Sequence, residues 1–77
     1  MNWKTYLVMY FGANGIPITE IVKKVESLGF KAALGPVDFE YDWKNKVPTK
    51  EDVFRIGDKL TILLKGTGII FNLDTHD

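Results

Sequence analysis

Apolar and acidic residues alternate strictly between Val37 and Trp43, where the chain reads Val-Asp-Phe-Glu-Tyr-Asp-Trp. Successive side chains of a β-strand point to opposite faces of the sheet, so one face of this stretch is apolar and the other carries carboxylates. A helical period would scatter the carboxylates around the axis. The alternation therefore predicts a strand over residues 37–44 with one buried and one solvated face.

Three elements precede this strand, and the first two are a strand and a helix. Residues 4–11 are rich in β-branched and aromatic side chains on both faces, which is typical of an interior strand. Apolar residues at helical spacing then predict a helix over residues 17–28, with Pro17 suited to its first turn. Gly29 stands where a left-handed C-terminal cap is expected. Residues 12–15, Gly-Ala-Asn-Gly, have the composition of a turn and match no phosphate-binding motif.

Residues 30–34 predict a short strand that ends at the Gly35-Pro36 break. This strand and residues 37–44 form either a hairpin, which we favour, or one bent strand with a bulge at Gly35.

Thr49 followed by Asp52 resembles a capping box and marks the start of a second helix. Its apolar stripe consists of Val53, Ile56, Leu60, Leu63 and Leu64. Gly57 lies on the stripe, and we expect it to allow close approach to the sheet. Residues 66–68, Gly-Thr-Gly, end the helix, and residues 69–75 predict a last strand. A competing interpretation makes residues 60–64 a strand that forms a hairpin with residues 69–73.

The resulting order, β-α-β-β-α-β, predicts a single α+β domain over residues 1–77 with the ferredoxin-like sandwich architecture. In that architecture two helices cover one face of a four-stranded antiparallel sheet of order 4-1-3-2, and the first and third strands are central. The resemblance is one of architecture, because no family motif is identified. The helix-covered face is predicted to hold Leu7, Met9, Phe11, Phe39, Tyr41, Phe71 and Leu73.

The opposite face of the sheet is left without cover and is the predicted binding surface. It is expected to present Tyr6, Val8, Tyr10, Asp38, Glu40, Asp42, Asn72 and Asp74, with His76 at its end. A register shift of one residue would exchange the two faces of the first strand, and this alternative stays open at the level of sequence.

Composition narrows the classes of function. The chain has 77 residues, of which 45% are hydrophobic and 26% are charged, with ten basic residues balancing ten acidic ones. A net charge near zero argues against a protein that grips nucleic-acid phosphates and opposes self-association only weakly. The absence of cysteine excludes disulfides, thiolate nucleophiles, zinc knuckles and iron–sulfur clusters. A domain this small without such cross-links relies on its core, on oligomerisation, or on both.

The N-terminal residues show no basic segment followed by an apolar run, and the apolar runs are too short to span a bilayer. We therefore expect a cytoplasmic protein without a membrane segment.

The acidic row suggests a site for a hard cation, which takes oxygen ligands. Residues two apart on a strand are roughly 7 Å apart, too far for three carboxylates to share one ion. Asp42 with Asp74, or Asp74 with His76, remain as pairs, but solvated charges are the simpler interpretation. We predict no metal and no cofactor.

Three functions are compatible with these residues. We favour a non-enzymatic association or ligand-binding module that forms a homo-oligomer, most simply a dimer, through its uncovered sheet face or edge. A cofactor-independent enzyme is an alternative, with Tyr6, Tyr10, Tyr41 or His76 as acid or base. An RNA-binding domain is a further alternative, since tyrosines on an open sheet can stack bases, but the neighbouring carboxylates would repel phosphates.

Overall fold

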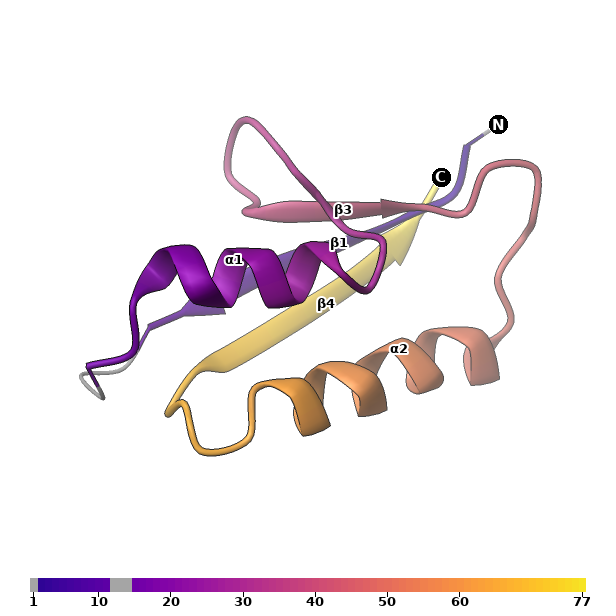
Figure 1. Ribbon diagram of the computed structural model, residues 1–77. Helices are drawn as coiled ribbons and strands as arrows, with labels where there is room; N and C mark the ends of the chain where they lie inside the picture. Colours follow the sequence, from indigo (N-terminus) through magenta and orange to yellow (C-terminus); the bar gives the residue numbers. More distant parts are fainter. Residues whose placement is uncertain (1, 12–14) are drawn as a thin grey trace.

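The computed structural model of this chain describes residues 2–11 and 15–77. It is an α+β fold in which four antiparallel strands form one sheet and two helices pack on it (Figure 1). The elements, in chain order, are β1 (Lys4–Tyr10), α1 (Ile18–Glu26), β2 (Lys31–Ala32), β3 (Phe39–Asp42), α2 (Lys50–Leu63) and β4 (Ile70–His76). The strand order is β2-β3-β1-β4, so the first and third strands are central, as predicted.

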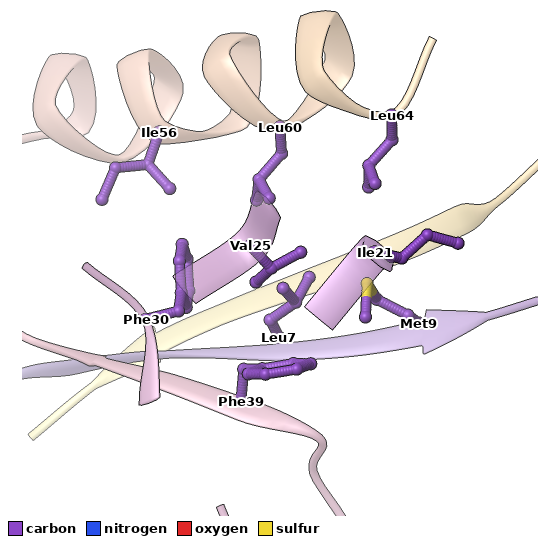
Figure 2. Packing of buried hydrophobic residues seen from close by; sticks show 9 residues of the cluster. All are labelled: Leu7, Met9, Ile21, Val25, Phe30, Phe39, Ile56, Leu60 and Leu64. Carbon is purple, nitrogen blue, oxygen red and sulfur yellow. The ribbon is translucent and has the colours of Figure 1, made fainter. Parts of the chain in front are cut away.

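Both helices cover the same face of the sheet. Leu7 and Met9 of β1 and Phe39 of β3 lie in one buried cluster with side chains of α1, and α2 lies across the top of it (Figure 2). The cluster consists of Leu7, Met9, Ile21, Val25, Phe30, Phe39, Ile56, Leu60 and Leu64. Burial of these side chains is the main force that holds the layers together. Phe11 is a correction to the predicted set, because it lies beyond the end of β1 and is exposed.

The start of β3 differs from the prediction. The strand begins at Phe39 rather than Val37, because the Asp38 side chain takes over the contact with β1. Its Oδ2 atom accepts the N–H of Met9 at 2.8 Å, while its own N–H donates to the Leu7 carbonyl at 3.0 Å. The hairpin of β2 and β3 is confirmed, with Ala32 opposite Phe39.

The second helix is confirmed and the competing strand over residues 60–64 is wrong. Leu60 is fully buried from within α2. Both hydrogen bonds of the predicted capping box are present: Thr49 Oγ1 accepts the Asp52 N–H at 3.1 Å, and Asp52 Oδ2 accepts the Thr49 N–H at 2.9 Å. Positive φ angles at Gly66 and Gly68 turn the chain after the helix, as the composition of this segment predicted.

One buried polar contact joins three segments of the sheet layer. Thr5 is fully buried, and its Oγ1 atom accepts the Trp43 Nε1–H at 2.8 Å and lies 2.8 Å from Thr75 Oγ1. Among the residues the structure describes, no buried side-chain nitrogen or oxygen lacks a hydrogen-bond partner. The contact therefore fixes the residue that follows β3 and the C-terminal end of β4 to β1 without a desolvation penalty.

Candidate binding surface

The face of the sheet opposite the helices, here called the open face, is defined by the strand register. One row across the sheet consists of Lys31, Glu40, Tyr6 and Asp74, and the next of Asp42, Lys4 and His76. Val8 opposite Asn72 and Tyr10 opposite Ile70 form the remaining rows. The alternation within each strand placed these side chains on one face, and no exchange of faces in β1 has occurred.

Charge and apolar surface occupy different halves of the open face. The charged half consists of the two rows that contain Lys4 and Glu40. The Nζ atom of Lys4 and the Oε1 atom of Glu40 are 3.5 Å apart. The apolar half consists of Val8, Tyr10 and Ile70, and the last two are 56% and 69% exposed although they are directly opposed. Lys4 thus offsets part of the acidic charge that the sequence predicted here.

Tyr6 and His76 form an aromatic pair beside the charged half. Their rings are stacked, with centroids 4.7 Å apart and planes inclined by 27°. His76 Nε2 also lies 3.7 Å from Asp74 Oδ2. The stack lies on the surface of the sheet.

The connection between β2 and β3 partly overhangs the open face, which the residue pattern did not predict. Figure 1 shows this connection rising on the side of the sheet away from α2. Its residues Leu34, Pro36 and Val37 line a groove of about 310 Å³ together with Tyr6, Asp74 and His76. Leu34 is fully exposed at the rim. The sequence contains one indication of this groove: the apolar residues Leu34 and Val37 stand on either side of the Gly35-Pro36 break.

Seven of the eight predicted surface residues lie on the open face as strand residues: Tyr6, Val8, Tyr10, Glu40, Asp42, Asn72 and Asp74. Asp38 is the correction. It precedes β3, and its carboxylate is occupied by the backbone of Met9. Ile70 belongs to the surface but was not among the predicted residues, although its position two residues before Asn72 would have identified it.

The tyrosines and the histidine that were candidates for proton transfer do not lie together in one site. Tyr41 lies on the helix-covered side, in edge contact with Phe30 and Trp43 at centroid distances of 5.5 and 4.8 Å. Tyr6 and His76 are on the opposite side of the sheet. Within residues 2–11 and 15–77, no hydrogen bond joins Tyr6 to His76. The structure thus provides one stacked pair rather than a linked set of proton-transfer groups.

Of the two residue pairs suggested for a cation, Asp74 and His76 lie 3.7 Å apart, whereas Asp42 and Asp74 are on separated strands. Asp42 and Asp74 belong to β3 and β4, which β1 separates. In the described part of the chain, no group of three or more potential ligand residues is close enough to hold an ion. The same residues contain no helix that is long and apolar enough to cross a bilayer.

A separate polar cluster lies at the start of α2. Asp52 accepts the N–H of Thr49, its Oδ2 atom lies 3.1 Å from Lys46 Nζ, and its Oδ1 atom lies 3.6 Å from Arg55. The backbone N–H of Thr49, followed by Lys46, lowers the pKa of Asp52 below its ordinary value of 3.8. These contacts are those of a helix cap, so we assign the cluster to stability.

Comparisons with protein-family models, with curated proteins and with solved structures found no match to this chain.

Proposed function

We propose that this chain is a non-enzymatic association module that forms a homo-oligomer through the surface its sheet leaves uncovered, the open face or its edge. The observation that carries the proposal is the exposed apolar strip of Tyr10 and Ile70, which continues inward to Val8. Contiguous apolar surface of this kind on a small domain is typical of a contact site. The net charge of zero adds little repulsion between copies.

We also propose that the architecture is ferredoxin-like. The support is the strand order β2-β3-β1-β4 together with two helices that contribute to one core cluster. This architecture serves many functions, so the proposed function rests on the surface and not on the fold.

The test is sedimentation velocity from about 1 μM to about 1 mM, which covers the affinities of weak and moderate complexes. We expect a reversible shift from monomer to dimer. Ile70→Lys should weaken the dimer, whereas Ile62→Lys is the matched control because Ile62 is similarly exposed, at 75% against 69%, but lies on α2. A strict monomer over the whole range, or equal effects of both variants, would refute the proposal.

A second candidate is the binding of a small apolar ligand, and the groove beneath Leu34 favours it. Its lining combines aliphatic side chains with the stacked rings of Tyr6 and His76, and its volume of about 310 Å³ suits a ligand of modest size. Titration with an apolar fluorescent dye tests it. Enhancement that is lost in Leu34→Asp supports the ligand site, whereas unchanged fluorescence in the parent chain dismisses it.

A further inference from the structure

The hydrogen bonds of β1 reveal which backbone groups of β4 face outward. The Leu7 carbonyl and the Met9 N–H both bond to Asp38, on the β3 side. Odd-numbered residues of β1 therefore direct their backbone groups toward β3, and even-numbered residues direct theirs toward β4. Directly opposed residues of an antiparallel pair either both face one another or both face away.

Tyr6 opposes Asp74 and Val8 opposes Asn72, so these residues of β4 face β1. The N–H and C=O groups of Phe71, Leu73 and Thr75 consequently point out of the sheet. β4 is the last strand in the sheet order, and no turn, loop or side-chain hydrogen bond recorded among the described residues uses these groups. The outer edge of β4 thus presents a row of unpaired donors and acceptors.

Edge strands of monomers normally carry features that prevent pairing with another chain, such as proline, lysine, a bulge or a short length. β4 has none of these, since its seven residues pair with β1 in unbroken register and its one acidic residue, Asp74, points to the open face. The opposite edge is different. β2 has two residues, one of them Lys31, and Pro36 follows in the connection to β3. The β2 edge of this sheet is therefore protected against pairing with another chain, and the β4 edge is not.

We propose that two copies of this chain pair through β4, antiparallel, with Leu73 opposite Leu73 of the second copy. This inference rests on the proposed function and specifies its surface. The register uses the whole strand: Phe71 lies opposite Thr75 of the second copy, and Ile70 opposite its His76. All outward N–H and C=O groups of Phe71, Leu73 and Thr75 then find partners.

The polar side chains of β4 also favour the register in which Leu73 lies opposite Leu73 of the second copy. Asn72 lies opposite Asp74 of the second copy, so its amide can donate to that carboxylate on the open face. A pairing centred on Asp74 would instead oppose two carboxylates, which is destabilising. A pairing centred on Asn72 would leave the end of β4 unpaired.

The symmetry of the pairing explains why it stops at a dimer. Each copy uses its long edge, and the remaining edge, β2, is too short to continue the sheet. The α2 helices of the two copies approach one another on the helix-covered face of the new sheet, because Gly57 of α2 lies against Leu73. Phe54, one turn before Gly57 and exposed, lies on the same flank of α2 and can be covered by the second copy.

Amide hydrogen exchange on the full chain, followed by NMR, tests the proposal directly. We expect the amides of Phe71, Leu73 and Thr75 to exchange rapidly in dilute solution and slowly at concentrations where sedimentation shows a dimer. The amides of Asn72 and Asp74, bonded to β1, should be protected at both concentrations and serve as internal controls. Rapid exchange of the first set in the dimer would overturn the edge proposal while leaving the proposed function intact. A protein that is monomeric throughout would overturn both.

Backbone substitution gives an independent test. Thr75→Pro removes the outward N–H, and Thr75→Val is its matched control because it removes the same hydroxyl but keeps the N–H. Relative to Thr75→Val, we expect Thr75→Pro to raise the dimer dissociation constant by roughly 5- to 150-fold, the effect of two symmetry-related hydrogen bonds. Equal constants for the two folded variants would contradict the edge pairing. If Thr75→Pro does not fold, the hydrogen-exchange experiment still tests whether the two copies pair through β4.

Substitutions at Tyr10 and Asn72 distinguish pairing through the edge from pairing through the open face and test the register. Tyr10→Lys changes the open face on central strand β1, so it should leave an edge dimer intact and abolish a face-to-face dimer. Asn72→Lys should tighten the dimer and Asn72→Asp should weaken it, each by roughly 2- to 30-fold for two symmetric pairs. Asn45→Lys and Asn45→Asp make the same charge changes at an exposed loop position. Equal shifts at both positions would show that net charge, not register, governs association.

Discussion

Two glycines of this chain should respond to alanine in opposite directions. Gly57 lies inside α2, and a Cβ atom built there would meet Leu73 Cδ1 at 3.7 Å, an ordinary van der Waals distance. Gly29 has a φ of +101°, and its Cβ would lie 2.9 Å from Tyr41 Cε2. The first site therefore has room and a helical backbone, whereas the second has neither room nor a conformation that alanine tolerates.

The magnitudes follow from these environments. In a helix interior, glycine is less favourable than alanine by about 0.8–1.0 kcal/mol, so Gly57→Ala should raise the free energy of unfolding by about 1 kcal/mol. For a domain of this size that corresponds to an increase in Tm of about 4–8 °C. Gly29→Ala should lower the free energy of unfolding by about 1–2 kcal/mol for the left-handed conformation alone. Displacement of Tyr41, whose ring is held between Phe30 and Trp43, adds to that loss.

Urea titrations followed by tryptophan fluorescence measure both variants, at a concentration low enough to exclude association. Trp43 reports on the sheet layer because its indole is bonded to buried Thr5. A Gly57→Ala variant that is less stable than the parent would refute the reasoning, since it would mean that α2 approaches β4 too closely for a methyl group. That result would restore the sequence-based expectation that this glycine is required for close packing.

Two other predictions follow from polar contacts. Asp38→Ala should lower the free energy of unfolding by about 1–3 kcal/mol in urea titrations, because the N–H of buried Met9 loses its acceptor; Asp38→Asn, which keeps an acceptor oxygen, is the control and should lose less. Asp52→Asn should be less stable than the parent at neutral pH and approach it in acid. The folded-state pKa of Asp52 is lowered, so its contribution is complete above the ordinary value of 3.8 and disappears as the pH falls through the lowered pKa. Unfolding measured from pH 7 to pH 2 checks this, and a constant difference between the two proteins would contradict it.

Local sequence patterns were sufficient for most of the secondary structure. The stripe that contains Ile56 and Leu60, with the capping box at Thr49, identified α2 because helical periodicity and capping chemistry act over a few neighbouring residues. The period-2 alternation in residues 37–43 assigned Phe39 and Glu40 to opposite faces for the same reason. These signals depend on near neighbours, so a single sequence contains them in full.

The start of β3 shows where local patterns fail. Val37 and Asp38 continue the alternation, yet Asp38 leaves the strand because its carboxylate meets the N–H of Met9, a residue 29 positions away. Nothing near Asp38 in the sequence reveals that partner. Gly57 is a similar case, since its distance to Leu73 depends on how α2 sits on the sheet.

The amino-acid sequence by itself determined which residues share a face of each strand and helix, because side-chain periodicity is a property of the local backbone. Only the tertiary structure decided which part of the open face is partly covered and which edge of the sheet stays unpaired. It placed Leu34 over the open face, and it left the outward backbone groups of Phe71, Leu73 and Thr75 without a partner. These outcomes depend on contacts between distant segments, whose geometry is set by the packing of the whole chain.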